Sequence, residues 1–261
     1  MDSLFDLTGK VALVTGGSRG LGLQMVRAFA RAGADVVIAS RKLDTCQEAA
    51  AEVEAMGRKA LAYACHVGRW GELDGLVDAA YARFGKVDVL VNNAGMSPLY
   101  RSLEEVTEDN FDKVVAVNFK GPFRLSALVG ARMYRGEGGS IINISSTASQ
   151  NTSPTATPYG GAKAALNAMT GGFAAAYAPK VRANVIVAGP FGTDIAEHWS
   201  DPPDPEHPGW SRSGLRIGRP EEIVGAALYL ASDASSFTSN AQIRIDGAGW
   251  KGHRTDAPTK Y

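Results

Sequence analysis

The residue pair with the clearest chemical potential is Tyr159 and Lys163, which are four positions apart in an alanine-rich segment. On a helix this spacing puts both side chains on one face, one turn apart. A buried ammonium near a phenol favours the phenolate and lowers the phenol pKa from about 10 toward neutrality. A tyrosine with such a pKa can exchange a proton with an alcohol or carbonyl oxygen near pH 7. Ser146, which follows the apolar run at residues 141–144, could hydrogen-bond the same oxygen.

Tyr-x-x-x-Lys alone is a weak signal, because an ordinary exposed helix start can carry the same pair. The chemistry therefore depends on the elements around it. An apolar run at residues 10–15 predicts a buried parallel strand, and residues 23–32 predict a helix. The glycine-rich loop between them favours phosphate binding over a simple tight turn, because a helix N-terminus supplies N–H groups and a positive dipole end. The loop residues predicted to bind phosphate are Gly16, Ser18, Arg19, Gly20, Leu21 and Gly22.

The end of the second predicted strand, residues 35–39, indicates which dinucleotide is bound. An acidic residue there would hold the adenosine ribose of NAD(H), but the sequence has Ser40 and Arg41 instead. Arg19 lies in the glycine loop nearby in such a fold. Guanidinium groups stay charged and donate in a planar fork, which suits a 2′-phosphate and predicts NADP(H) over NAD(H). In the alternative interpretation, both arginines are solvated or paired with Asp44 and other local acids.

Two further strand ends carry residues expected at the cofactor. The strand at residues 60–65 ends at His66 and Val67, and we expect His66 near the adenine with no proton-transfer role. The strand at residues 87–91 is followed by Asn93, Ala94 and Gly95. Small residues here let a ligand lie on the backbone, although Asn and Gly also form plain turns.

A long helical pattern over residues 103–135 contains Asn118. Asn is mildly unfavourable inside a helix, and Pro122 four residues later disturbs the helix hydrogen bonds. The combination predicts a locally irregular helix around a functional asparagine. A surface asparagine is the alternative.

The sequence pattern in the C-terminal part of the chain predicts a helix, a strand and a long loop. Small side chains over residues 159–177 predict either a subunit interface or tight packing on the sheet. After a strand at residues 181–187, the stretch at about 190–217 is rich in Pro and Trp, and we expect a substrate lid there rather than a disordered surface loop. A helix at residues 220–231, a strand at 241–245 and a tail at about 247–261 follow.

The composition is that of an ordinary soluble globular protein, with 45% hydrophobic and 21% charged residues among 261. The formal net charge of zero argues against a nucleic-acid partner. No apolar run reaches the roughly 18 residues that span a bilayer, and no signal peptide is evident, so we expect a cytoplasmic protein without a membrane partner. Cys46 and Cys65 are expected to be semi-buried thiols, and the four histidines show no grouping as metal ligands.

The alternation of strands and helices predicts a single domain over residues 1–261. The expected architecture is an α/β fold, a doubly wound Rossmann-type parallel sheet of about seven strands flanked by helices. No internal repeat or domain linker is evident.

Taken in order, these motifs resemble the short-chain dehydrogenase/reductase family over about residues 7–249. Each motif is weak alone, but their order and spacing make the set highly specific. The resemblance rests on Thr15-Gly16-x-x-x-Gly20-x-Gly22, Asn92-Asn93-Ala94-Gly95, Asn118, Ser146 thirteen residues before Tyr159, Tyr159-x-x-x-Lys163, Arg182-Ala183-Asn184 and Gly218-Arg219-Pro220-Glu221-Glu222.

The resemblance implies hydride transfer between NADP(H) and a ketone, aldehyde or secondary alcohol. It implies that Tyr159 gives its proton to the oxygen, that Ser146 orients this oxygen, and that Lys163 lowers the tyrosine pKa and holds the nicotinamide ribose. Asn118 would hold a water that relays protons to Lys163. Members of the family also use the long alanine-rich helix to build homodimers and homotetramers.

The resemblance also implies cofactor contacts beyond the sixth strand, and here the chain departs from the family. The Phe191 backbone and the Thr193 hydroxyl would anchor the carboxamide, beside Gly189. The usual Pro-Gly at this place is Ala188-Gly189, and the usual Asp that contacts adenine is His66. Further departures are Gly160-Gly161 for Ser-Ala and Asn240 for Gly, and none removes a catalytic group.

Two other functions remain open at this point. A 3-oxoacyl-thioester reductase, acting on an acyl-carrier-protein or CoA thioester, shares the core motifs and Arg19. The Trp and Pro content of the expected lid favours a compact or cyclic apolar substrate instead. A non-catalytic cofactor-binding scaffold on the same fold is disfavoured by the intact set of Asn118, Ser146, Tyr159 and Lys163.

Overall fold

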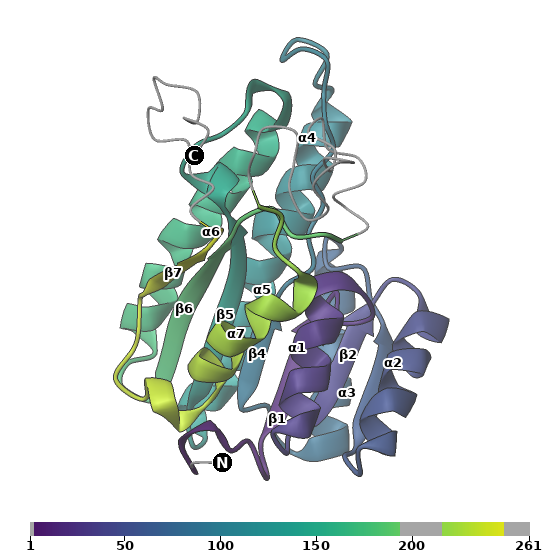
Figure 1. The fold of residues 1–261 in the computed structure, drawn as a ribbon, viewed down its shortest axis with the longest axis vertical. Coiled ribbons are helices and arrows are strands. Elements are labelled where there is room, and N and C mark those ends of the chain that lie inside the picture. Colours follow the sequence, from purple (N-terminus) through teal and green to yellow (C-terminus); the bar gives the residue numbers. More distant parts are fainter. Residues whose placement is uncertain (1–2, 194–215, 248–261) are drawn as a thin grey trace, which may run out of the picture.

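The computed structural model describes residues 3–193 and 216–247, and in this part of the chain seven parallel strands form one sheet. The strand order is β3-β2-β1-β4-β5-β6-β7, so the order reverses between β1 and β4. Figure 1 shows the sheet between two layers of helices, which is the doubly wound α/β architecture expected from the sequence. The strands are β1 (Val11–Thr15), β2 (Asp35–Ser40), β3 (Ala60–Ala64), β4 (Val89–Asn92), β5 (Gly139–Ser146), β6 (Val181–Ala188) and β7 (Gln242–Ile245).

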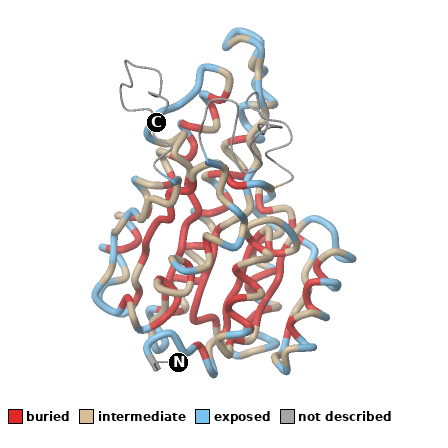
Figure 2. Tube along the Cα trace, in the orientation of Figure 1, coloured by how far each residue is buried: buried red, intermediate tan, exposed pale blue. Residues whose placement is uncertain are grey.

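Helices cover both faces of the sheet because alternate strand residues point to opposite sides. On one face, α1, α2 and α7 pack on a core that includes Val14, Ile38 and Ile142. On the other face, α3, α5 and α6 pack on a core that includes Leu13, Leu90 and Ile141. Figure 2 shows the buried strands at the centre of the molecule. The helices are α1 (Gly20–Arg31), α2 (Leu43–Ala55), α3 (Trp70–Phe84), α4 (Glu108–Val115), α5 (Gly121–Arg135), α6 (Thr157–Ala176) and α7 (Val224–Ala231).

The long helix predicted over residues 103–135 is interrupted, as its sequence suggested, by a π-helical turn at Ala116–Lys120. The Gly121 N–H donates to the Ala116 carbonyl, five residues back, and Pro122 has no N–H to continue the regular pattern. The prediction was wrong at the start, because residues 103–106 precede the helix. Thr107 caps α4 by accepting the Asn110 N–H through its side chain.

Other element boundaries differ from the predictions by a few residues. Helix α6 begins at Thr157, two residues earlier than expected, and Pro220–Ile223 forms a short 3₁₀ turn before α7. Helix α3 ends as predicted, with Gly85 in the left-handed conformation at φ 77°. Asn240 also adopts a positive φ of 59°, a conformation that Asn tolerates better than most residues.

The two cysteines are more deeply buried than expected, with exposed fractions of 0% for Cys46 and 3% for Cys65. Both are free thiols, and burial raises the pKa of Cys65 to about 12. Among the described residues, no helix is both long and apolar enough to cross a membrane. The predicted tail and most of the predicted lid, residues 248–261 and 194–215, lie outside the described part of the chain.

Candidate active site

A cavity of about 720 Å³ opens at the carboxyl ends of the strands, where the strand order reverses. This is the place at which open α/β sheets bind ligands. One end of the cavity, beyond β2, is lined by Arg19, Arg41 and Lys42. The other end, beyond β5, is lined by Tyr159 and Lys163. The described lining residues include no Asp or Glu, so the cavity favours an anionic ligand.

The glycine loop between β1 and α1 has the backbone shape that phosphate binding requires. Gly16 has φ 63°, and a Cβ on Gly22 would lie 2.1 Å from the Gly16 carbonyl oxygen. Asn93 fixes this loop by donating to the Thr15 and Gly16 carbonyls at 2.9 and 3.2 Å. No side chain caps the N-terminus of α1 at Arg19, so its N–H groups are open to a ligand phosphate.

The end of β2 presents hydroxyl groups and a guanidinium to the cavity. Ser18 Oγ donates to Ser40 Oγ at 3.0 Å, and Ser40 Oγ lies 3.1 Å from the buried Cys46 thiol. The alternative pairing of Arg41 with Asp44 is not formed, and no other carboxylate in the described residues forms an ion pair with Arg41. Arg41 is exposed at the cavity, as a ligand for a phosphate group would have to be.

The end of β3 carries the histidine that stands where the family has an acid. His66 Nδ1 accepts the Gly68 N–H at 3.1 Å, so the proton of the neutral imidazole lies on Nε2. The His66 N–H donates to the Glu72 carboxylate at 2.7 Å, and Glu72 also pairs with Arg69 at 2.9 Å. His66 therefore offers the cavity a hydrogen-bond donor, whereas an Asp would offer an acceptor.

Lys163 and Tyr159 lie together on α6, and burial decides the protonation of both. The Lys163 ammonium is 3% exposed, donates to the Ile144 carbonyl at 2.8 Å and lies 5.7 Å from the centre of the Tyr159 ring. Burial lowers the pKa of Lys163 to about 8. Burial also raises the pKa of Tyr159, and the hydrogen bond with Ser146 lowers it only in part.

The predicted lowering of the Tyr159 pKa by Lys163 is therefore wrong for the protein alone. The physical reason is that the same burial disfavours both the phenolate and the ammonium that was expected to stabilise it. The expected neighbourhood of Ser146, Tyr159 and Lys163 is nevertheless formed, because the end of β5 and the first turns of α6 meet at this end of the cavity.

Asn118 lies in the π-helical turn, is fully buried and does not line the cavity. Its amide nitrogen donates to the carbonyls of Met96 and Val114 at 2.8 and 3.0 Å, and its oxygen accepts the Met96 N–H at 3.3 Å. The asparagine thus holds the chain after β4 against the helix. A Cβ on Gly95 would lie 3.1 Å from the Asn118 oxygen and 3.7 Å from Lys163 Nζ, so Gly95 leaves room for both side chains at this wall of the cavity.

A buried chain of polar side chains connects the sheet to the helices behind the site. Asn92 Nδ2 donates to Ser126 Oγ on α5 at 3.0 Å and to Asn143 Oδ1 on β5 at 2.8 Å. Asn143 Nδ2 donates in turn to Thr170 Oγ1 on α6 at 2.9 Å. Because all of these groups are buried, the chain fixes α6 relative to β4 and β5.

The chain beyond β6 closes the cavity on its far side. Phe191 is buried and pairs with Gly218, where the Gly192 N–H donates to the Gly218 carbonyl and the Gly218 N–H to the Pro190 carbonyl, both at 2.9 Å. Thr193 lies beside the glycine loop, 3.4 Å from the place of a Cβ on Gly20.

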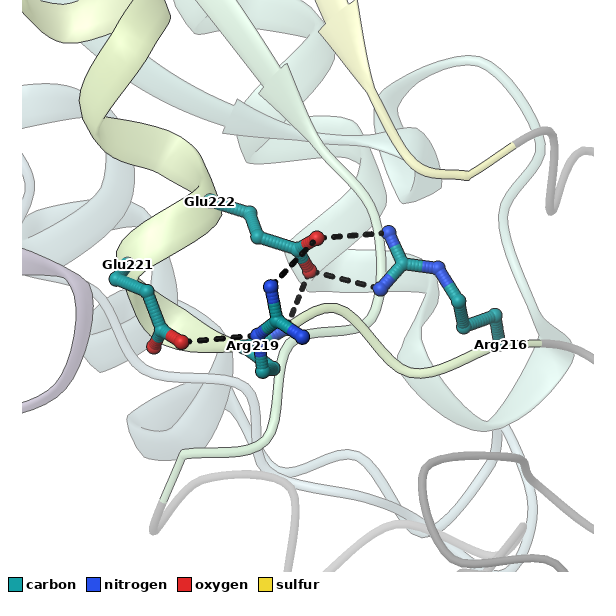
Figure 3. A network of polar contacts seen from close by, with 4 residues as sticks. All are labelled: Arg216, Arg219, Glu221 and Glu222. Carbon is teal, nitrogen blue, oxygen red and sulfur yellow. Dashed lines mark hydrogen bonds and ion pairs between the residues drawn. The ribbon is translucent and has the colours of Figure 1, made fainter.

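An ion-pair network holds the chain just after Gly218 and before α7 (Figure 3). Glu222 accepts two hydrogen bonds from Arg216, at 2.8 and 3.1 Å, and one from the Arg219 N–H at 2.7 Å. These donors lower the pKa of Glu222 to about 2. The network therefore holds the chain at Arg216 against the turn that precedes α7.

The structure brings together nearly all the residues predicted for the site. Sequence reasoning did not predict several cavity-lining residues that carry a hydroxyl or a positive charge. The only indication of their role in the sequence was a position between a strand and the next helix. These residues are Lys42, Thr45, Ser97, Thr147, Ser153 and Thr155. Gly22 and Asn118 lie behind the cavity wall, and the predicted residues that line it are Gly16, Ser18, Arg19, Gly20, Leu21, Ser40, Arg41, His66, Val67, Asn93, Ala94, Gly95, Ser146, Tyr159, Lys163, Gly189, Phe191 and Thr193.

Comparisons with known proteins agree with this fold. Residues 10–204 match the family model described as short chain dehydrogenase. The chain is 38% identical over 250 residues to an uncharacterized oxidoreductase of Methylorubrum extorquens, covering 92% of this chain and 98% of that protein. A short-chain type dehydrogenase/reductase from Mycobacterium marinum superimposes with a TM-score of 0.86 at 35% identity, covering 94% and 96% of the two chains.

A further similar structure is the NADPH-dependent 3-quinuclidinone reductase of Rhodotorula rubra, with a TM-score of 0.83, 26% identity and coverage of 94% and 92%. Fold, site and these similarities together define a dehydrogenase/reductase that works with a nicotinamide dinucleotide. The chain belongs to the short-chain dehydrogenase/reductase family, and it is an oxidoreductase of that type.

Proposed function

We propose that this protein is an NADP(H)-dependent reductase of ketones or aldehydes, which also oxidises the corresponding secondary alcohols. The observation that carries the proposal is the arrangement of one cavity, with Ser146, Tyr159 and Lys163 at one end and Ser40 and Arg41 at the other. The bound dinucleotide would supply or accept the hydride. The uncapped N-terminus of α1 and the glycine loop fit its pyrophosphate.

The side chains then have distinct tasks. The Ser146 hydroxyl, which hydrogen-bonds Tyr159, holds the substrate oxygen beside the phenol. Tyr159 donates its proton to this oxygen as the carbonyl is reduced, and a raised pKa suits a group that must be protonated before it acts as an acid. Lys163 lies behind the phenol and supplies positive charge when it is protonated. Asn118 fixes the Met96 backbone that borders this place.

The preference for NADP(H) rests on the end of β2. Arg41, Lys42 and the Ser18–Ser40 hydroxyl pair face the cavity without any acid among its described lining residues, which suits a 2′-phosphate better than a ribose hydroxyl. The relative from Rhodotorula rubra is described as NADPH-dependent, in agreement with this proposal. His66 and Val67 would border the adenine, and Phe191 with Thr193 the carboxamide.

We further propose that two copies associate through the outer face of α6. An apolar groove of about 510 Å³ lies between α4 and α6, lined by Phe111, Phe119, Pro158, Ala162 and Ala165 among others. Phe111 is 48% exposed, and a second copy would cover it in a homodimer or homotetramer. Light scattering coupled to size exclusion, with Ala165→Arg as the disruptive variant, tests this. Cytoplasmic localisation stays a prediction.

The test of the function is oxidation of NADPH, with NADH in parallel, against cyclic ketones, short ketones and an acetoacetyl thioester. Tyr159→Phe accompanies each assay. We expect ketone turnover with NADPH preferred, and a loss of about 10²–10⁴-fold in kcat for the variant, because it lacks the proton donor. Turnover of the thioester alone would favour the 3-oxoacyl-thioester reductase. Tyr159→Phe as active as the unmodified protein would overturn the catalytic assignment.

A further inference from the structure

The substrate end of the cavity is rich in hydroxyl groups. Besides Ser146 and Tyr159, five residues with hydroxyl side chains at or after the ends of β4 and β5 line the cavity: Ser97, Ser145, Thr147, Ser153 and Thr155. Among the described residues, the hydroxyls of Ser97 and Thr147 make no hydrogen bond, and both residues are half-buried. They are therefore available to a ligand within the cavity.

Ser153 and Thr155 form a second pair of hydroxyls at this end. Their oxygens lie 2.9 Å apart, and the Thr155 N–H donates to Ser153 Oγ at 3.3 Å. The Thr155 carbonyl accepts the Tyr100 N–H at 3.0 Å, which ties this short segment to the chain after β4. A hydroxyl pair held in this way can accept one hydrogen bond and donate another, as a hydroxylated substrate requires.

The charges at the two ends of the cavity differ. Arg19, Arg41 and Lys42 line the cofactor end, whereas Lys163 is the cation that lines the described substrate end. Its ammonium is already bonded to the Ile144 carbonyl, and burial lowers its pKa to about 8. A substrate carboxylate or phosphate would thus find no arginine in the described lining at this end, so the wall suits a neutral, hydrogen-bonding molecule.

On the basis of the proposed function, we propose that the substrate is a neutral α-hydroxy ketone, with the vicinal diol as the reduced product. Ser146 holds the carbonyl oxygen, and Thr147, the next residue, offers a hydroxyl for the neighbouring oxygen. Both residues line the cavity, and the Thr147 hydroxyl makes no hydrogen bond within the described residues. Bound NADPH would supply the hydride that the carbonyl carbon takes up. Tyr159 gives its proton to the carbonyl oxygen, and its phenolate regains a proton from solvent as the diol leaves.

This inference differs from the expectation of a compact or cyclic apolar substrate, which rested on the Pro and Trp residues of segment 190–217. Most of that segment, residues 194–215, lies outside the described part of the chain. The walls that are described include Met96, Leu99 and Ala148 as apolar surface, but they also carry the hydroxyl groups of Ser97, Thr147, Ser153 and Thr155. A site built to hydrogen-bond a substrate hydroxyl rejects the analogue that lacks it, because its own polar groups are then left unpaired.

The experiment compares two ketones that differ by one hydroxyl, acetoin and 2-butanone, with saturating NADPH. We expect kcat/KM for acetoin to exceed that for 2-butanone at least tenfold. Thr147→Val and Thr155→Val, made separately, should each reduce this ratio about fivefold. The value of kcat/KM should fall for acetoin and should not fall for 2-butanone, because the hydroxyl that 2-butanone leaves unpaired has been removed. The ratio is insensitive to the fraction of folded enzyme, since both ketones are measured on one preparation.

The matched control is Thr45→Val, the same change at the cofactor end of the cavity, which should leave the acetoin-to-butanone ratio unchanged. Equal specificity for the two ketones, or a preference for 2-butanone, would overturn the α-hydroxy ketone inference and leave the proposed reductase standing. A protein that binds NADPH, measured by its fluorescence, but reduces neither ketone nor any other carbonyl compound would overturn both.

Discussion

The Lys163 ammonium donates a hydrogen bond to the Ile144 carbonyl at 2.8 Å, so this buried cation is held by the backbone of β5. No acidic side chain among the described residues that line the cavity balances its charge. Burial lowers its pKa to about 8, and the unfolded chain would restore a value near 10.5. The position of Lys163 therefore costs folding free energy whenever the ammonium is charged.

We expect Lys163→Met to be more stable than the unmodified protein at pH 7. Each pKa unit corresponds to about 1.4 kcal/mol, which gives an upper limit on the order of 3 kcal/mol, reduced by the lost hydrogen bond. Between pH 8 and 10.5 the unfolded chain binds more protons at this site than the folded one, so stability of the unmodified protein rises with pH. The difference in Tm between Lys163→Met and the unmodified protein should therefore become smaller as the pH rises from 8 to 10.5. The exposed Lys113→Met serves as the control, and a difference that grows with pH would contradict the prediction.

Arg41→Ala should weaken NADPH binding selectively. Loss of one charged hydrogen bond to a phosphate costs about 1.5–3 kcal/mol, so we expect KM for NADPH to rise about 10- to 100-fold and KM for NADH to change less than twofold. Arg135→Ala removes an exposed guanidinium that does not line the cavity and is the matched control. An equal loss for both dinucleotides would show that Arg41 does not read the 2′-phosphate.

We expect His66→Asp to increase the preference of the cofactor site for adenine over hypoxanthine. The Nδ1 of His66 already accepts the Gly68 N–H, so this side chain presents a donor where the 6-amino group of adenine needs an acceptor. We expect the ratio of Kd values for the hypoxanthine analogue of NADPH and for NADPH to rise at least fivefold in His66→Asp, as followed by NADPH fluorescence. His66→Asn should give a smaller increase. An unchanged ratio would mean that position 66 does not contact the base.

Thr170→Val should destabilise the protein through the buried polar chain. Thr170 is fully buried, accepts the Asn143 amide at 2.9 Å and donates to the Leu166 carbonyl at 2.8 Å. Valine leaves the Asn143 donor unpaired, which costs about 1–3 kcal/mol. Thr170→Ser keeps the hydroxyl and should cost less, so urea unfolding of the two variants separates the hydrogen bond from packing. Equal losses would assign the effect to packing alone.

The sequence was sufficient to predict the order of strands and helices along the chain. It also predicted many of the residues that line the cavity. Alternation of apolar strands and helices, with residues such as Gly16 and Ser146 at the strand ends, predicted one doubly wound sheet, and the structure confirms it. The π-helical turn was foreseeable from Asn118 and Pro122, because a proline removes one backbone donor.

Protonation and the cavity walls were less accessible to sequence reasoning. The direction of the Tyr159 pKa depends on burial, which no local pattern reports. Likewise, Ser97 and Thr155 are far apart in sequence and meet at one cavity only after folding. Their hydroxyls carry no spacing signal, so the polarity of the substrate end could not be predicted.

The π-helical turn also determines how the protein would respond to the loss of one residue from this segment. Helices α4 and α5 are continuous through residues 116–120, which contain one residue more than a regular helical turn would hold. Removing that extra residue would leave a regular α-helical turn, so α4 and α5 would join as one uninterrupted α-helix. What the deletion would remove is the widened turn in which the fully buried Asn118 bonds the Met96 backbone. The extra residue therefore serves the position of one side chain, and the two helices could be continuous without it.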